Sequence, residues 1–306
     1  MSSSPEILFA PRGTQFVDFI KSVLMRCTFS KSELKTITND EACLTRFKDA
    51  FTHESADPDR NYEFLEKIGD SCVNKCIRFY IIKKFPSLHT KQGVEYISEL
   101  ESKWKSTSYL SSFADKLNFK SFISADVDSI SKNIRTRSED VFEAFIGALE
   151  LNVDSIRGDN TGYGVCYEFM TSLLDEIKVV YSYEQLINSK SRLNELFLGL
   201  KDNSLKLTYS TTSRVDKKDG RIFRSNIVIG GKTMGDSIHF NKLDKEYLAQ
   251  IGLTYTPPYR RKIVAEKVAA EVAIYNLIRQ SRVNKSTNLY TSVQKMYAKK
   301  ALNPFK

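Results

Sequence analysis

The amino-acid sequence predicts two domains, an all-α domain followed by an α+β domain, and three observations support this. Apolar residues recur at helical spacing through most of residues 15–180. Residues 188–280 instead contain two strand-like runs, LKLTYSTTSR and RIFRSNIVIGG, between a short and a long helical stretch. The net charge changes at the same place, from −4 over residues 1–180 to +13 over residues 181–306, which together give +9.

The expected organisation follows from these changes. Residues 1–14 form an N-terminal extension, 15–180 the helical domain and 181–187 a linker. Residues 188–280 form a unit of order α-β-β-β-α, in which the turn VDKKDG joins the first two strands and SIHFN (237–241) is the expected third strand. The basic tail, 281–306, is expected to be a mobile arm or a weakly held helix.

The composition excludes several classes of protein. No apolar run is long enough to span a bilayer, and the first 25 residues lack the pattern of a signal peptide. The cysteines have neither metal-binding nor redox spacing; they are Cys27, Cys43, Cys72, Cys76 and Cys166. A reducing compartment is therefore expected, the cytoplasm first, with the nucleus or an organelle as the alternatives. The basic second half favours a polyanionic partner such as nucleic acid.

The stretch NYEFLEKIGDS (61–71) places three acids on one face of a helix. Glu63, Glu66 and Asp70 are spaced by three and four residues, away from the apolar face. Like charges one turn apart repel each other, so a neutralising cation would favour this stripe. Gly69 costs about 1 kcal/mol within a helix, and it would allow a neighbouring helix to come close.

A second pair of acids, Asp140 and Glu143, shares a face of the largely apolar helix SEDVFEAFIGALE. Burying a charge is costly unless it has a partner. If the two helices cross, Glu66 and Asp70 converge with this pair into a site with only oxygen ligands, which suits Mg²⁺ or Mn²⁺. Gly147, like Gly69, would allow the neighbouring helix to approach closely. For either segment alone, a solvated acidic face remains the alternative interpretation.

Three motifs in order resemble the ribonuclease III family over about residues 40–180. NYEFLEKIGDS is similar to the family signature E-R-L-E-F-L-G-D-S, and EDVFEAFIGAL resembles A-D-x-[FV]-E-A-x-I-G-A. FTHES (51–55) resembles the threonine-histidine-x-serine segment that precedes the signature. The resemblance implies a helical endonuclease domain that forms a homodimer and cleaves both strands of double-stranded RNA. It also implies Mg²⁺-dependent hydrolysis that leaves 5′-phosphate and 3′-hydroxyl ends with a short 3′ overhang.

The resemblance assigns roles to individual acids. The metal-binding and catalytic residues of the family map onto Glu66, Asp70, Asp140 and Glu143, and Glu63 lies near the site without being a ligand. The chain departs from the signature and from the second motif at several positions. Phe64 replaces an arginine, and Lys67 replaces the phenylalanine that packs into the partner subunit. Glu139 replaces an alanine and adds a negative charge beside Asp140.

Residues 188–280 resemble a double-stranded RNA-binding domain, with about twenty residues, near 236–257, inserted before the last helix. Such domains recognise the shape and the 2′-hydroxyls of A-form RNA. The expected contacts come from the first helix, from the VDKKDG turn and from the start of the last helix: Ser191, Asn194, Glu195, Lys217, Lys218, Arg260, Arg261, Lys262 and Lys267.

The resulting prediction is a double-stranded-RNA-specific endoribonuclease of RNA processing or duplex RNA degradation. Mg²⁺, which Mn²⁺ can replace, would be held by the four acids and would lower the pKa of the attacking water. The alternative is a double-stranded RNA-binding protein that does not cleave, acting as a silencing suppressor or as a scaffold in a ribonucleoprotein. The sequence does not identify the natural RNA or the pathway.

Overall fold

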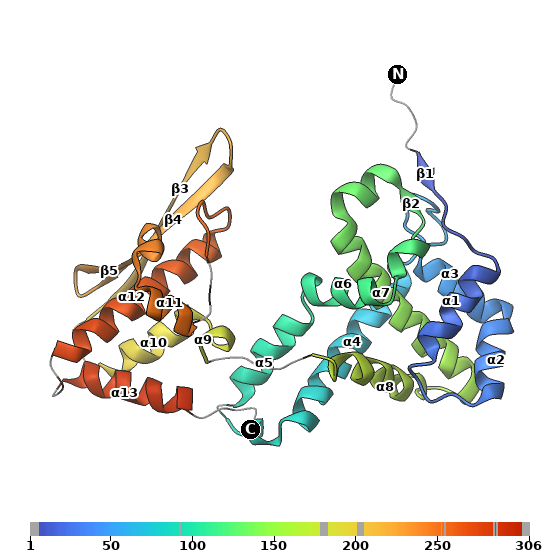
Figure 1. The fold of residues 1–306 in the computed structure, drawn as a ribbon, viewed down its shortest axis with the longest axis horizontal. Coiled ribbons are helices and arrows are strands. Elements are labelled where there is room, and N and C mark those ends of the chain that lie inside the picture. Colours follow the sequence, from blue (N-terminus) through green and yellow to red (C-terminus); the bar gives the residue numbers. More distant parts are fainter. Residues whose placement is uncertain are drawn as a thin grey trace. The chain divides into compact units, whose positions relative to one another are not determined.

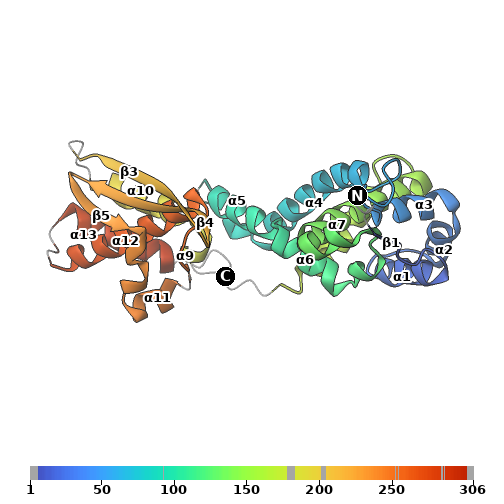
Figure 2. The same cartoon turned by 90° about the horizontal axis from the view of Figure 1, so that it is seen from above.

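A computed structural model describes residues 6–91, 93–177, 183–200, 205–251, 253, 255–283, 285 and 287–301 of the chain. The chain divides into two compact units, Met1–Lys178 and Val179–Lys306 (Figure 1, Figure 2). Among the described residues, no helix is long and apolar enough to cross a membrane.

The first unit is helical, as predicted. Its helices are α1 (Thr14–Leu24), α2 (Lys31–Asn39), α3 (Glu41–Ala50), α4 (Glu63–Lys84), α5 (Gly93–Trp104), α6 (Thr107–Lys116), α7 (Val127–Arg157) and α8 (Gly162–Leu174), with 3₁₀ turns at Pro86–Leu88 and Phe119–Phe122. Helix α7 packs against α3, α4, α6 and α8, so it runs through the core. Phe142 and Phe145 of α7 are fully buried and meet Phe119 and Phe169 ring to ring.

A half-buried arginine attaches the N-terminal segment to this unit. Strand β1 (Ile7–Leu8) pairs antiparallel with β2 (Ala125–Asp126). The Arg12 guanidinium donates to the carbonyl oxygens of Phe122 (2.7 Å) and Phe51 (2.9 Å), and to the hydroxyl of Ser124 (3.0 Å). One side chain therefore ties the segment before α1 to two loops that are distant in the sequence.

The second unit joins a three-stranded sheet to helices. Its elements are α9 (Tyr183–Leu186), α10 (Ser189–Gly199), β3 (Leu207–Asp216), β4 (Gly220–Ile229), β5 (Lys232–Asp236), a 3₁₀ turn (Ser237–Lys242), α11 (Lys245–Ile251), α12 (Lys262–Val283) and α13 (Asn288–Ala301). The antiparallel sheet has the order β3-β4-β5. Helix α12 packs on it through buried Ala265, Ala269 and Ala273, so close that a Cβ on Gly235 would lie 2.1 Å from the Ala269 carbonyl oxygen.

The prediction of a strand at 237–241 is wrong. The third strand forms just before it, at Lys232–Asp236, because Gly230 and Gly231 both adopt positive φ (54° and 77°) and turn the chain back after β4. Residues 237–242 instead form a 3₁₀ turn, in which the Asp236 carboxylate accepts from the Ile238 backbone nitrogen (3.1 Å). That local hydrogen bond offers the backbone an alternative to a sheet ladder.

The segment between β5 and α12 contributes to the core of the unit. Arg192 of α10 and Glu271 of α12 form a fully buried ion pair. Tyr247 of α11 donates its hydroxyl proton to Glu271 Oε1 (2.6 Å). Because buried charges require partners, this tyrosine completes the polar contacts of an ion pair that joins α10 to α12.

The C-terminal segment forms a helix, the second of the two predicted alternatives. Ser292 of α13 donates to the Leu196 carbonyl oxygen (3.1 Å), and Asn288 donates to that of Leu200 (3.1 Å). Gly199 has no side chain at the place where Ser292 approaches. Helix α13 therefore packs directly on α10, and Val293 is buried.

Candidate active site

Helices α4 and α7 touch at two glycines. A Cβ on Gly69 would lie 1.7 Å from the Glu143 carbonyl oxygen, and a Cβ on Gly147 would lie 2.2 Å from that of Leu65. Any residue other than glycine would thus force the helices apart. The expectation that these glycines permit close packing is confirmed, and the contact brings the acidic stretches of the two helices together.

The acids lie at this crossing, in one pocket of 360 Å³. Its lining residues are Glu66, Lys67, Asp70, Lys105, Glu139, Asp140 and Glu143. All four acids proposed as metal ligands are therefore brought together. Glu63 is exposed and does not line the pocket. Lys105, which comes from the junction of α5 and α6, was not anticipated.

Burial and mutual repulsion shift the proton affinities of these acids. Burial, followed by the charge of Asp70, raises the pKa of Glu143 to about 8. Burial and the charge of Asp140 raise the pKa of Glu66 to about 7. Burial also raises the pKa of Asp140 and of Glu139. Carboxylates whose ionised forms are disfavoured by burial and by one another's charge would be stabilised by a cation.

Two side chains that the sequence analysis did not single out orient the acids. The buried Tyr62 hydroxyl donates to Asp140 Oδ2 (3.1 Å) and accepts from Arg137 Nη1 (2.9 Å). Asn74 donates through Nδ2 to Asp70 Oδ1 (2.9 Å). Asn74 follows Asp70 by four residues, a spacing that could have revealed it. Tyr62 is separated from Asp140 by 78 residues, and no local pattern links the two.

The donor set fits Mg²⁺ or Mn²⁺, because carboxylate oxygens are the ligands that such hard cations prefer. Within the described residues, no three His, Cys, Asp or Glu side chains are already arranged to hold a metal ion. The fit therefore rests on the chemistry of the carboxylates and on the pocket they share.

The residues expected to contact RNA lie on connected elements of the second unit. Asn188 caps α10, which carries Ser191, Asn194 and Glu195. Lys190 at the start of α10 pairs with Glu266 of α12 (2.7 Å), so the beginnings of these helices lie together. Lys217 and Lys218 are exposed in the β3–β4 turn.

The residues that lead into α12 are also held to the rest of this unit. Arg260 pairs with Asp219 of the β3–β4 turn (2.9 Å). Arg261 is exposed, Lys262 lies 3.8 Å from Glu266, and the Lys267 carbonyl oxygen accepts from Ser189. Ion pairs and hydrogen bonds thus connect the three groups of predicted contacts.

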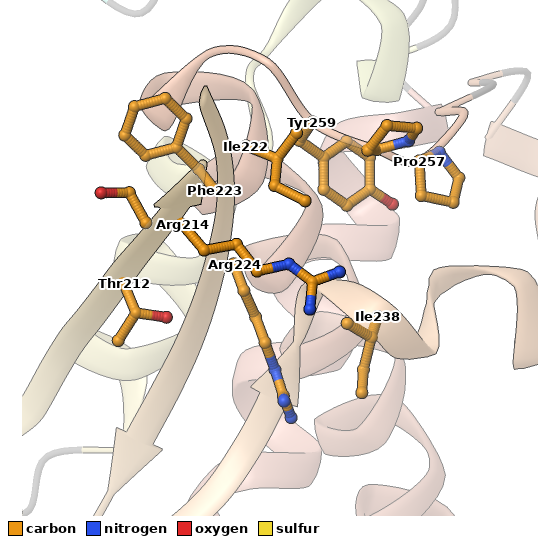
Figure 3. A pocket seen from close by; sticks show the side chains of 10 residues that line it. Thr212, Arg214, Ile222, Phe223, Arg224, Ile238, Pro257 and Tyr259 are labelled. Atoms are coloured by element: carbon orange, nitrogen blue, oxygen red, sulfur yellow. The ribbon is translucent and has the colours of Figure 1, made fainter. Parts of the chain in front are cut away.

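A second hollow, of 390 Å³, lies between the β3–β4 hairpin and the segment that precedes α12 (Figure 3). Its lining residues are Thr212, Ser213, Arg214, Ile222, Phe223, Arg224, Ile238, Pro257, Pro258 and Tyr259. The Tyr259 carbonyl oxygen accepts from the Phe223 backbone nitrogen (2.8 Å), which brings the inserted segment back to β4. The insertion noted in the sequence therefore builds one wall of a pocket.

Comparison with known proteins identifies the class of protein. Residues 63–154 match the family model of the ribonuclease III domain. A protein of Invertebrate iridescent virus 6 that is named as a ribonuclease 3 is 31% identical over 230 residues, 71% of this chain and 78% of the viral protein. The ribonuclease 3 of Ligilactobacillus salivarius is 24% identical over 211 residues, 65% of this chain and 85% of the bacterial one.

A solved structure, the nuclease domain of ribonuclease III from Campylobacter jejuni, is 22% identical, with a TM-score of 0.38; the match covers 48% of this chain and 96% of that domain. The sequence matches define a phosphodiester hydrolase, an endoribonuclease. The chain belongs to the ribonuclease III family, and the resemblance seen in its motifs is confirmed.

Proposed function

We propose that this endoribonuclease cleaves double-stranded RNA with Mg²⁺ and leaves 5′-phosphate and 3′-hydroxyl ends with short 3′ overhangs. Its role would be RNA processing or the degradation of duplex RNA. The observation that carries the proposal is the pocket where α4 and α7 cross, into which both helices contribute acids. Phosphoryl transfer requires that negative charge be positioned and neutralised, and such a pocket is suited to this.

Glu66, Asp70, Asp140 and Glu143 would hold Mg²⁺, or Mn²⁺ in its place. When bound, the cation supplies an activated water and offsets the charge that develops on the leaving oxygen. Tyr62 and Asn74 each fix one oxygen of an acid, Asp140 Oδ2 and Asp70 Oδ1, through their hydrogen bonds. Each of these acids keeps its second oxygen for the cation, so the side chains are oriented before the substrate arrives.

The second unit would supply most of the affinity for RNA. The proposed domain limits are 15–180 for the endonuclease domain and 188–280 for the double-stranded RNA-binding domain. Within the latter, the exposed Lys217 and Lys218 would contact phosphates, and Ser191 and Asn194 of α10 would reach the minor groove. The other proposed contacts are Glu195, Arg260, Arg261, Lys262 and Lys267.

A homodimer formed through the first unit would place two pockets on one duplex, so that both strands are cut. Lys67 stands at the signature position where the family has a phenylalanine that packs into the partner subunit, and its side chain lines the pocket. Phe64, three residues earlier, is 70% exposed. The oligomeric state can be measured directly by sedimentation or by light scattering.

The decisive experiment compares the wild type with Glu143→Gln, which exchanges one carboxylate oxygen for an amide at nearly constant volume. A long duplex RNA is incubated with each protein in Mg²⁺ or in EDTA, and the ends of the products are mapped. We expect Mg²⁺-dependent cleavage by the wild type, a loss of several orders of magnitude in the variant, and unchanged binding of the duplex. Cleavage by Glu143→Gln at the wild-type rate would refute the assignment of the site.

A further inference from the structure

The acidic pocket contains two lysines, Lys67 of α4 and Lys105 of the junction between α5 and α6. The pocket is lined by five carboxylates and these two ammonium groups, a formal charge of −3 when all are ionised. Both lysines are exposed. Among the described residues, no acid lies within ion-pair distance of the Lys105 ammonium. A lysine among five acids that is not neutralised by them remains available to an anion.

The position of Lys105 is fixed on both sides. On one side, Trp104 is fully buried and meets Tyr80 of α4 edge to face, at 5.9 Å between ring centroids. On the other side, the Thr107 side chain forms a hydrogen bond with the Glu139 carboxylate of α7. The residues on either side of Lys105 thus contact the two helices that carry the acids, Trp104 contacting α4 and Thr107 contacting α7. The Lys105 backbone nitrogen also donates to the Glu101 carbonyl oxygen (3.0 Å).

This arrangement gives Glu139, the additional acid of the pocket, a structural role. Its carboxylate holds the beginning of α6 through Thr107, although it also adds negative charge beside Asp140. Phosphate carries negative charge, so an additional acid in the pocket opposes its approach. Lys105 supplies the opposite charge in the same pocket, at the turn that Glu139 anchors.

We infer that Lys105 binds a non-bridging oxygen of the phosphate that is cleaved, and that Thr107 and Glu139 position it. The inference rests on the proposed function of the pocket. The two lysines change the formal charge of the pocket from −5 to −3, so they reduce the repulsion that an anionic phosphodiester meets there. A lysine is suited to this contact because its ammonium is a point charge that donates hydrogen bonds.

The test separates a phosphate contact from support of the metal site. Lys105→Gln removes the charge and preserves most of the side-chain length, and Lys105→Arg keeps the charge. Lys35→Gln is the matched control, because Lys35 is an exposed lysine of α2 that does not line the pocket. Cleavage of a duplex RNA is measured in single turnover, and Mg²⁺ binding to the RNA-free protein is measured by titration calorimetry.

The expected result is opposite in the two measurements. Lys105→Gln slows cleavage by about ten- to a hundredfold, the effect of losing a charge-assisted hydrogen bond. The same variant binds Mg²⁺ about two- to fivefold more tightly, because a positive charge has left the pocket. Lys105→Arg recovers most of the cleavage rate, and Lys35→Gln changes neither quantity.

Two outcomes would overturn the inference while the proposed function stands. Lys105→Gln could cleave at the wild-type rate, or it could lose Mg²⁺ binding together with activity, which would make Lys105 a structural support of the acids. If the wild type itself does not cleave duplex RNA in Mg²⁺, the proposed function fails and this inference fails with it.

Discussion

Gly69 and Gly147 lie in contact where α4 crosses α7: a methyl group on either glycine would come within 3.0 Å of the backbone nitrogen of the other. Each helix therefore presents bare backbone to its neighbour. The acids flank this contact within one or two turns, so the distance between the two helices also sets the distance between the carboxylates.

The first prediction concerns this contact. Gly69→Ala places a Cβ 1.7 Å from the Glu143 carbonyl oxygen, so the helices must separate. We expect a loss of stability of about 1–3 kcal/mol, the usual cost of overpacking, and a large loss of cleavage. Gly164→Ala is the control, since its Cβ would meet open space in α8, and it should gain about 0.5–1 kcal/mol. Urea denaturation measures both variants, and equal stabilities would contradict the prediction.

The second prediction concerns the hydroxyl of Tyr62. Tyr62→Phe removes the hydrogen bond to Asp140 Oδ2 and keeps the buried ring. We expect the variant to fold with a loss of about 1 kcal/mol, and to cleave about tenfold more slowly because Asp140 is no longer oriented. Single-turnover rates measure the effect. A rate equal to that of the wild type would show that Arg137 alone orients this acid.

The third prediction is a dependence of stability on pH. Burial raises the pKa of Glu143 to about 8 in the folded state, against the ordinary 4.5 of an unfolded chain. The folded protein thus binds more protons between these values, and its stability falls as the pH rises from about 4.5 to 8. Glu143→Gln has no carboxylate at this position, so its stability relative to the wild type should increase over the same range.

We expect this advantage to reach on the order of 2 kcal/mol at pH 8 in EDTA, after allowance for screening, or roughly 4–8 °C in melting temperature. Thermal melts at pH 5, 6, 7 and 8 measure it. Mg²⁺ should stabilise the wild type more than the variant at pH 8. Parallel curves for the two proteins would show that Glu143 titrates normally.

The fourth prediction concerns the β3–β4 turn. The double substitution Lys217→Gln and Lys218→Gln should weaken duplex RNA binding equally for different sequences. It should also reduce the slope of log affinity against log salt by about two. Lys232→Gln with Lys242→Gln is the control, because these exposed lysines belong to the same unit and are not among the expected contacts. An equal change of slope in the two double variants would mean that this turn has no special contact with RNA.

Sequence reasoning identified the acids of the active-site pocket because they follow helical periodicity, and it identified the glycines of the helix contact because glycine is costly within a helix. Glu66 and Asp70 are one helical turn apart, as are Asp140 and Glu143. Gly69 and Gly147 each interrupt a helical stretch with the residue that, after proline, favours helix least. The periodicity that predicts each helix thus also predicts the face on which its acids lie. Only the crossing of α4 and α7 had to be assumed.

The features that escaped prediction depend on contacts between distant parts of the chain. Tyr62 precedes its helix and has no regular spacing to Asp140, and Lys105 lies in a turn between helices. The run SIHFN resembled a strand, yet the Gly230–Gly231 turn had already started the third strand at Lys232. Turn chemistry and tertiary hydrogen bonds decided these cases, and local composition did not.

Arg12 lies outside residues 63–154, the part that matches the family model, yet a chain of hydrogen bonds connects it to the site. Its guanidinium donates to the Thr52 hydroxyl (3.3 Å), and the Thr52 carbonyl oxygen accepts from the backbone nitrogen of Tyr62 (2.9 Å), whose own hydroxyl holds Asp140. A shortened protein that began at Thr14 would keep every acid of the pocket and would lose the hydrogen bond from Arg12 to Thr52. The hydrogen bonds that support the nuclease site therefore extend into residues 1–14, beyond the proposed limits of 15–180.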